Sequence, residues 1–185
     1  MKKFIFLFAI FGMTNFAHAK FEIQTSTGYT SSTDGKTKNA FSDMTNHIFL
    51  GASFDSKEQI IVGQNVSLVS GQYKTTTTDK LSTMELGPKL TYYINSDKTF
   101  FTSTTWNPYA KGTRTAAGVA EDISGWSYIF AMGAVSKLGN NFYLGASLNY
   151  HSLSITKSIS GTTATTESSA YTSLMPMLNI SLRFR

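Results

Sequence analysis

Apolar and polar side chains alternate with a period of two residues along the last two-thirds of this chain. From Phe142 to His151, every second position is apolar or aromatic, and the positions between are small, polar or, at Tyr143, aromatic. Successive side chains of a β-strand point to opposite faces. The pattern recurs about eight times along the chain, so it predicts eight strands that each have one apolar face and one polar face.

The segments between the expected strands alternate in length. The expected strands span residues 21–30, 45–54, 59–72, 83–94, 99–110, 125–137, 141–153 and 170–184. Short turns at 55–58, 95–98 and 138–140 alternate with long segments rich in Thr, Ser, Gly and charge at 31–44, 73–82, 111–124 and 154–169. Short periplasmic turns and long extracellular loops are typical of outer-membrane barrels. The sequence therefore predicts an all-β fold, an eight-stranded antiparallel up-and-down transmembrane β-barrel whose two ends lie on the periplasmic side.

The first 19 residues have the features of a cleaved export signal. Lys2 and Lys3 precede an apolar run at 4–13, and Ala17 and Ala19 place small residues where a signal peptidase cleaves. The run has about ten residues, whereas a membrane-spanning helix needs about 20. We therefore expect a signal peptide at 1–19, a mature barrel at 20–185 and a location in the bacterial outer membrane.

The composition fits a membrane wall with solvated loops. Only 15% of the residues are charged, whereas about 25% is usual in soluble proteins. The chain has no cysteine, so it can form neither a disulfide nor a cysteine-linked lipid anchor. It has no basic stripe, no cluster with metal-ligand spacing and no phosphate-binding glycine loop, so we expect no nucleic-acid partner, no metal and no cofactor.

Aromatic side chains gather at both ends of the apolar face. Ordinary strand enrichment in aromatic residues explains their number but not this placement. Membrane–water interfaces select aromatic side chains. We therefore expect two aromatic girdles on the outer wall: Phe21, Phe54, Phe100, Phe142 and Phe184 on the turn side, and Tyr29, Trp106, Trp126, Tyr128 and Tyr150 on the loop side.

Together these features resemble the small outer-membrane β-barrels of the OmpX type and the OmpA transmembrane domain. The resemblance covers the mature chain and includes a last strand that ends in Phe184. Residues 85–90, Glu-Leu-Gly-Pro-Lys-Leu, with Tyr92 also resemble a segment common in such barrels. Those barrels commonly end at the aromatic residue that the assembly machinery reads, whereas Arg185 follows Phe184 here. The resemblance implies an architecture and no particular activity.

The charged residues of the expected strands fall on the inward face. The interior of an eight-stranded barrel is only just filled by side chains, and buried charges need partners. We therefore expect a polar network rather than a solute pathway, and we expect Glu22 and Arg183 to approach each other where the first and last strands meet. The expected members are Glu22, Glu85, Lys89, Lys137 and Arg183, with Asn65, Asn107, Asn149 and Asn179 as further polar groups.

Three prolines, Pro88, Pro108 and Pro176, lie inside expected strands. A closed barrel has no free edge that would tolerate a missing N–H. We therefore expect a β-bulge at each proline, or a position above the membrane band.

Two histidines remain after the expected signal peptide, His47 and His151, and both fall near loop ends on the inward face. A His-x-Ser pair would resemble that of outer-membrane lipid A deacylases. Leu153 stands two residues after His151, however, and Ser152 faces the other side of the strand. We therefore interpret both histidines as interior polar groups and expect no catalytic residue.

The sequence predicts a non-enzymatic outer-membrane barrel with a structural or surface-interaction role. Its expected partners are outer-membrane lipid and lipopolysaccharide, and a candidate extracellular partner would meet the long loops at 31–44, 73–82, 111–124 and 154–169. Basic loop residues could contact lipopolysaccharide phosphates, although acidic residues offset them. The alternatives are a lipid A-modifying enzyme, a soluble periplasmic barrel that binds a small apolar ligand inside, and a channel.

Overall fold

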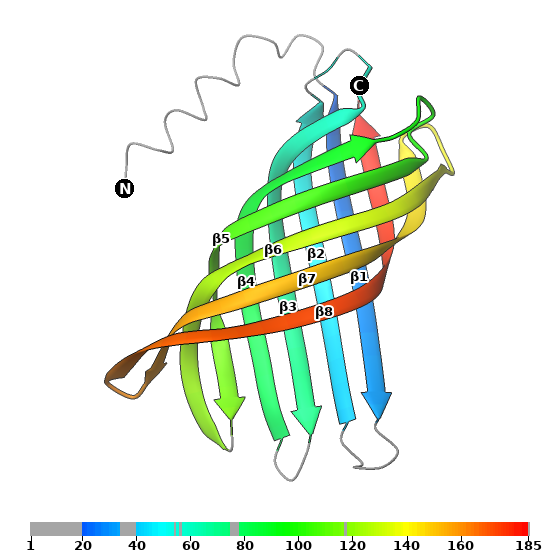
Figure 1. Cartoon of the computed structure of the whole chain (residues 1–185). Coiled ribbons are helices and arrows are strands. Elements are labelled where there is room, and N and C mark those ends of the chain that lie inside the picture. The colour runs from blue at the N-terminus through cyan, green and yellow to red at the C-terminus, as the bar shows by residue number, and fades with distance from the viewer. Residues whose placement is uncertain are drawn as a thin grey trace, which may run out of the picture.

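Eight antiparallel strands close into a barrel in the order β1-β2-β3-β4-β5-β6-β7-β8 (Figure 1). This computed structural model describes residues 20–33, 40–53, 55, 57–74, 78–116 and 118–184. The expected signal peptide at 1–19 and Phe54 lie outside the described residues. The closed ring confirms the predicted fold class. Its strands are β1 (Phe21–Thr33), β2 (Ala40–Ser53), β3 (Ile60–Lys74), β4 (Thr78–Tyr93), β5 (Phe100–Ala116), β6 (Val119–Lys137), β7 (Phe142–Ser160) and β8 (Thr163–Phe184).

The strands end near the predicted turns but extend well past the predicted loop boundaries. On the turn side, every strand end lies within one residue of its expected position. On the other side, β7 ends at Ser160 and β8 begins at Thr163, so residues 161–162 alone connect them where a loop at 154–169 was expected. Thr suits strands, but a strand that is polar on both faces gives no period-two signal. The loop boundaries at 31–44, 73–82 and 111–124 are wrong for the same reason.

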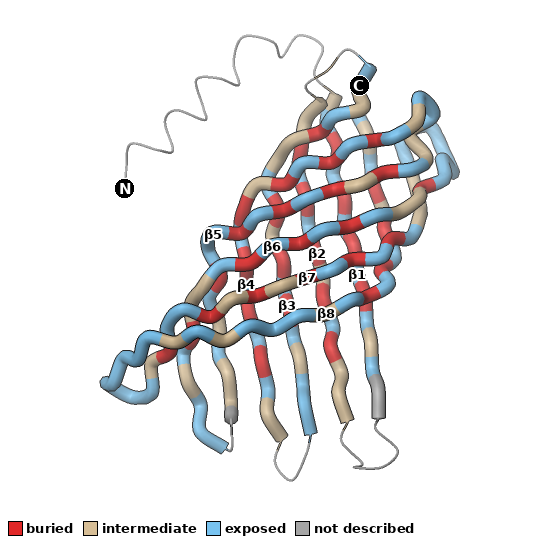
Figure 2. Tube along the Cα trace, in the orientation of Figure 1, coloured by how far each residue is buried: buried red, intermediate tan, exposed pale blue. Residues whose placement is uncertain are grey.

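Burial alternates residue by residue along the strands (Figure 2). On β1, Glu22 and Gln24 are 1% and 2% exposed, whereas Ile23 between them is 42% exposed. Apolar side chains therefore face outward and polar side chains face inward, which is the reverse of a soluble ligand-binding barrel. Within the described part of the chain, no helix has the length and apolar content that crossing a membrane requires.

Strand registers are irregular at two of the three prolines. The β4–β5 register shifts within residues 86–89, and the β5–β6 register shifts within residues 107–110. Pro88 and Pro108 lie in these two stretches. At both shifts the extra residue is on β5, the strand that carries Pro108, and Pro88 lies on the facing stretch of β4.

Pro176 instead ends the ladder that joins the first and last strands. It stays in register opposite Leu148 of β7, so no bulge forms there, and the alternative expectation of a position above the membrane band stays a prediction. Its carbonyl oxygen lies 2.8 Å from the position that a Cβ on Gly28 of β1 would occupy. The N–H and C=O of one strand residue point to the same neighbour, so the N–H that proline lacks would bond β1. The β1–β8 ladder accordingly ends at Gly28 and Met177.

Apolar clusters occupy part of the interior. The expectation that polar networks fill the lumen is therefore incomplete, because the inward face also carries bulky apolar residues. One cluster, at the turn end, comprises Phe49, Ile61, Tyr93, Phe101 and Val135, with Tyr143 packed against it. The other, in the loop half, comprises Leu81, Ala110, Ile123, Leu153 and Ile155.

Candidate functional site

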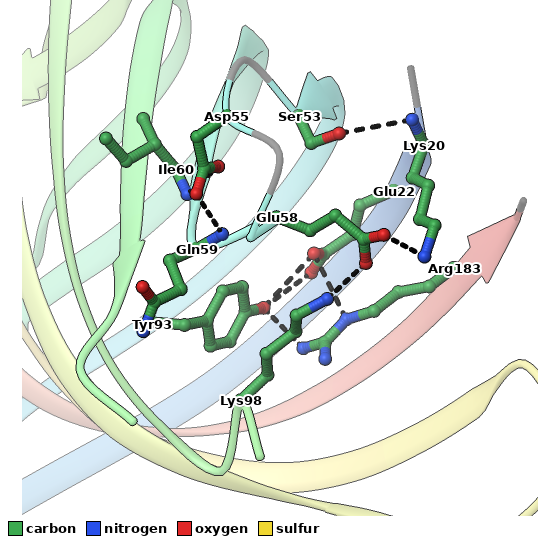
Figure 3. Close-up of polar contacts among 10 residues, drawn as sticks. All are labelled: Lys20, Glu22, Ser53, Asp55, Glu58, Gln59, Ile60, Tyr93, Lys98 and Arg183. Carbon is green, nitrogen blue, oxygen red and sulfur yellow. Dashed lines mark hydrogen bonds and ion pairs between the residues drawn. The ribbon is translucent and has the colours of Figure 1, made fainter. Parts of the chain in front are cut away.

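The inward side chains form layers, and the layer at the turn end joins the first and last strands (Figure 3). Glu22 of β1 and Arg183 of β8 are cross-strand partners, and Arg183 Nε lies 3.2 Å from Glu22 Oε2. The Tyr93 hydroxyl lies 3.0 and 3.1 Å from the two Glu22 oxygens, and Arg183 Nη2 donates to Tyr93 Oη at 2.5 Å. The guanidinium also covers the ring of Tyr143, 3.9 Å from its centroid. A buried ion pair therefore lies where β1 and β8 pair to close the barrel.

A tight turn beside this layer is built around Asp55. Its carboxylate accepts backbone N–H bonds from Gln59 at 3.0 Å and Ile60 at 2.8 Å. Partial burial raises the pKa of Asp55, but the donated backbone hydrogen bonds outweigh it, so the pKa lies below its ordinary value of 3.8. Glu58 of the same turn has a φ of 57° and forms an ion pair with Lys20 (Figure 3).

The next turn on this side repeats that geometry with an amide. Asn95 Oδ1 accepts the backbone N–H groups of Thr99 at 2.9 Å and Phe100 at 3.0 Å. Lys98 has a φ of 55° and forms an ion pair with Glu58 of the preceding turn. The two turns are therefore linked across the barrel end.

The second layer holds the buried Lys89 of β4. Its Nζ donates to Gln24 Oε1 at 2.7 Å and lies 4.7 Å from the ring centroid of Phe49. An amide oxygen and an aromatic face thus stabilise the buried ammonium group.

The Glu85 carboxylate is the centre of the third layer. Ser127 Oγ donates to it at 2.5 Å, Asn107 Nδ2 at 3.3 Å and Thr83 Oγ1 at 3.1 Å, and His151 Nε2 lies 3.0 Å away. Glu85 is 0% exposed. These four partners occupy the acceptor sites of a buried carboxylate, which would otherwise be costly to desolvate.

The other histidine makes a different contact. His47 Nδ1 lies 2.8 Å from Ser67 Oγ, which also accepts Asn65 Nδ2 at 2.8 Å. Ser67 is 0% exposed, so this His–Ser contact is a packed polar pair inside the barrel. Among the described residues, no group of three or more His, Cys, Asp or Glu side chains could hold a metal ion.

One member of the expected network lies apart from it. Lys137 is the last residue of β6, and it is exposed although it shares the inward parity of Val135. The lumen meets solvent at the strand ends, so an ammonium group there needs no buried partner. The buried network also includes Tyr93 and Gln24, which the sequence analysis did not identify.

The nine described residues of the two expected girdles are all exposed on the outer wall. On the loop side, Trp126 stacks on Tyr128 with centroids 6.4 Å apart, and Tyr128 lies 5.9 Å from Tyr150. Aromatic rings therefore run continuously across β6 and β7.

Beyond this aromatic row, Arg114 joins two hairpins. Its Nη1 and Nη2 donate to the two oxygens of Glu167 on β8 at 2.6 and 3.1 Å, and Nη2 also donates to Glu121 of β6 at 2.6 Å. The bonds from Arg114, followed by one from Ser169, hold the pKa of Glu167 below its ordinary value of 4.5. The two carboxylates raise the pKa of the Arg114 guanidinium. The β5–β6 hairpin is thus tied to β8.

A pocket of about 200 Å³ lies in the loop half of the lumen, between β2, β3, β4, β7 and β8. Asp43 at its wall is 5% exposed and accepts a 3.5 Å hydrogen bond from Thr45 Oγ1. Sequence reasoning missed Asp43 because it assigned this position to a loop. The side chains that line the pocket include Phe41, Asp43, Val69, Leu81, His151 and Tyr171.

No protein-family model and no curated protein matches the sequence. Among solved structures, the chain is similar to Neisserial surface protein A (NspA), with 12% identity, 90% of this chain and 98% of that chain covered, and a TM-score of 0.48. It is also similar to the translocator domain of autotransporter NalP from Neisseria meningitidis, with 9% identity, coverages of 96% and 91%, and a TM-score of 0.42. The beta domain of the Bordetella autotransporter Brka has 9% identity, coverages of 90% and 98%, and a TM-score of 0.41.

The fold is that of an outer-membrane type barrel. The ring has an even number of antiparallel strands and closes without an edge at its turn end. Its outer face is apolar, and charged groups with partners lie inside. These are the features by which strands satisfy their backbone groups against lipid.

Proposed function

We propose that this chain is an integral protein of the bacterial outer membrane with a non-enzymatic role in envelope structure or in surface contacts made by its extracellular hairpins. Membrane lipid and lipopolysaccharide would be its immediate partners, and residues 1–19 would supply the export signal. The observation that carries the proposal is the apolar outer face of a closed strand ring.

The outer face is costly in water. Leu50, Leu148 and Leu174 are 57%, 50% and 59% exposed, and they lie on β2, β7 and β8. Apolar surface contributes about 25 cal/mol per Å² when it leaves water, and soluble monomers rarely expose apolar patches above a few hundred Å². Hydrocarbon around the ring removes this cost, while inter-strand bonds satisfy the backbone.

The limits of the membrane band follow from two features. The aromatic side chains Tyr29, Trp106 and Tyr150 mark the loop-side interface and are exposed. Unpaired strand edges cannot face hydrocarbon, and the β1–β8 ladder ends at Gly28, next to Tyr29. Both features favour the same boundary, beyond which the hairpins project into water.

The composition of the hairpins beyond this boundary suits water. Strand β8 begins with Thr163–Ser169, in which Ala164 is the one apolar residue. The inward groups there are charged, as the contacts of Arg114 and Glu167 illustrate. These hairpins are the candidate surface for extracellular partners.

The packed lumen supports a role without conduction. At the turn end, Phe49, Tyr93 and Phe101 belong to an apolar cluster, and Arg183 lies over the Tyr93 ring 4.3 Å from its centroid. Ions would have to pass both an apolar cluster and a fixed ion pair, and an eight-stranded interior leaves little further room.

The native tryptophans provide the decisive experiment. The chain has two, Trp106 and Trp126, 58% and 41% exposed on the outer wall. In vesicles of brominated phospholipid, we expect strong quenching of their fluorescence, greatest when bromine lies near the headgroups. The variants Trp106→Phe and Trp126→Phe each keep one tryptophan, so they show how much of the quenching comes from each side chain. Fluorescence that bromine leaves unchanged, or recovery of the protein in the periplasmic fraction, would contradict the proposal.

Two further measurements separate this proposal from catalysis and transport. Lipid A mass spectra from cells with and without the protein should be identical, and a changed acyl pattern would indicate an enzyme. Planar-bilayer recordings should give no stable conductance steps, and regular steps would indicate a channel.

A further inference from the structure

We propose that the pocket in the loop half of the lumen binds a small amphipathic amine, with its ammonium group on Asp43 and its apolar part against the pocket walls. This inference concerns a binding site and goes beyond the proposed role of the barrel in the membrane.

The charge of the pocket selects a cation. Asp43 is 5% exposed, the Thr45 hydroxyl donates a hydrogen bond to it, and Ser173 lines the same pocket. No described cationic side chain forms an ion pair with Asp43. A buried carboxylate is costly without a full counter-charge. Asp43 shares the neighbouring His151 with Glu85, so a ligand ammonium would supply further positive charge.

The groups around Asp43 reinforce this preference. His151 lines the same pocket, and its Nε2 lies 3.0 Å from Glu85 Oε2. With both carboxylates ionised, the three side chains carry a net charge of −1 when His151 is protonated and −2 when it is neutral. At the rim, Asp79 and Lys80 carry opposite charges. The interior field of the pocket is therefore negative in either state of the histidine.

The shape and lining of the pocket set the size of the ligand. Its volume of about 200 Å³ equals that of roughly seven water molecules at about 30 Å³ each, below the roughly 300–1,000 Å³ typical of sites for drug-sized ligands. Phe41, Val69 and Leu81 give apolar walls. One aromatic ring on a two-carbon amine, as in phenylethylamine, matches both the size and the polarity.

An inward glycine keeps the pocket open. Gly71 lines it, and a Cβ at Gly71 would have Leu81 Cβ at 3.9 Å as its nearest neighbour. A larger side chain at this position would therefore grow into the pocket without disturbing the strand backbone, which makes Gly71→Phe a variant that fills the site.

The strand ladder between β1 and β8 ends at Gly28 and Met177. Beyond Gly28 and Met177, strands β1 and β8 no longer pair, and β8 sweeps away from β1 across the front of the barrel (Figure 1). Tyr171 and Ser173 of this diverging part of β8 line the pocket. Entry of a ligand from the extracellular side would therefore break no hydrogen bond between β1 and β8.

The test uses the mature barrel refolded in detergent micelles and three probes of similar size: phenylethylamine, the neutral phenylethanol and the anionic phenylpropionate. Titration calorimetry against protein-free micelles corrects for partitioning. We expect the amine to bind one site and to bind about tenfold more tightly than the alcohol, equivalent to about 1.4 kcal/mol. We expect no measurable binding of the anion.

Variants locate the site. Asp43→Asn should lower the affinity for the amine about tenfold, to that of the alcohol. Asp122→Asn removes an exposed carboxylate of β6 outside the pocket and should leave binding unchanged. Gly71→Phe should abolish binding of amine and alcohol alike. Heat-modifiable gel migration checks that each variant folds.

Three outcomes would overturn the proposal: no amine binding to the unaltered protein, equal affinity for amine and alcohol, or amine binding that survives Gly71→Phe. If Asp43→Asn does not fold, the probe series and Gly71→Phe still decide between these outcomes.

Discussion

Glu22 Oε2 and Arg183 Nε lie 3.2 Å apart across the junction of β1 and β8, so one buried ion pair links the two ends of the strand sequence. Glu22 is 1% exposed. Tyr93 from the opposite side of the ring contacts both partners. Strand β8 is thus fixed to β1 by charge as well as by backbone pairing.

Loss of either charge should destabilise the barrel because it leaves the other buried and unpaired. For Glu22→Leu and for Arg183→Met, we expect the free energy of unfolding to fall by about 3–5 kcal/mol. The double variant should lose less than the sum, because it buries no uncompensated charge. Urea unfolding in detergent, followed by heat-modifiable migration, measures all three. Lys137→Met, at the exposed strand end, is the control and should change little. Additive losses would contradict a coupled pair.

Two inward glycines should respond very differently to alanine. A Cβ at Gly145 would lie 2.0 Å from the Ala134 backbone oxygen, whereas a Cβ at Gly71 would have no neighbour closer than 3.9 Å. Gly145→Ala must therefore push β6 and β7 apart, and we expect it to lower the free energy of unfolding by more than about 2 kcal/mol. Gly71→Ala should stay within about 0.5 kcal/mol of the unaltered protein. Equal effects at the two positions would show that β6 and β7 do not approach so closely.

The tie between Arg114 and Glu167 should open in acid. The pKa of Glu167 lies below its ordinary value of 4.5, mainly because Arg114 donates to it. A lowered pKa means that the stabilisation is complete above pH 4.5 and is lost as the pH falls through the folded-state pKa. Spin labels at the exposed Ala120 and Ala164 should report a broader distance distribution at pH 3 than at pH 7. Glu167→Gln should show the broader distance distribution at both pH values. The same distance distribution at pH 3 and pH 7 in the unaltered protein would refute this prediction.

Period-two alternation was sufficient to predict the strands and their faces, because lipid outside and polar groups inside impose opposite demands on neighbouring residues. It failed where both faces meet water. The stretch Thr163–Ser169 pairs as strand through its backbone, but its side chains carry no alternation. The approach of Glu22 and Arg183 was predictable because both lie at the turn end of neighbouring strands in a closed ring.

The pocket in the loop half of the lumen was not predictable from the sequence. It depends on the stagger between distant strands, which brings Asp43 of β2 beside His151 of β7 and Ser173 of β8. The end of the β1–β8 ladder also depends on which neighbouring strand loses the hydrogen bond that an N–H at Pro176 would have donated. A proline within a strand pattern does not reveal which neighbour that is. Tyr93 was missed because the sequence does not reveal whether an inward tyrosine packs its ring in an apolar cluster or joins its hydroxyl to a polar network; Tyr93 does both.

The turn at Asp55 offers a test in which the protein supplies its own control. Asp55 and Asn95 each accept the backbone N–H groups of the residues four and five positions further along the chain, in equivalent turns. Only Asp55 is charged. Asp55→Asn should therefore keep the turn and lose only the charge-assisted part of its hydrogen bonds. We expect a cost at pH 7 of about 1 kcal/mol or less in the free energy of unfolding, whereas Asp55→Ala should cost about 1–3 kcal/mol because it removes both charge-assisted hydrogen bonds.

Acid should abolish the difference between Asp55 and its asparagine variant. Backbone N–H bonds overcome the effect of partial burial and hold the pKa of Asp55 below 3.8. Its charge therefore stabilises the fold above that pH, and this contribution is lost as the pH falls through the folded-state pKa. The gap in unfolding free energy between the unaltered protein and Asp55→Asn should thus shrink from pH 7 to pH 2. Because every other titrating group is common to both proteins, a gap that stays constant would mean that the Asp55 charge does not stabilise the turn.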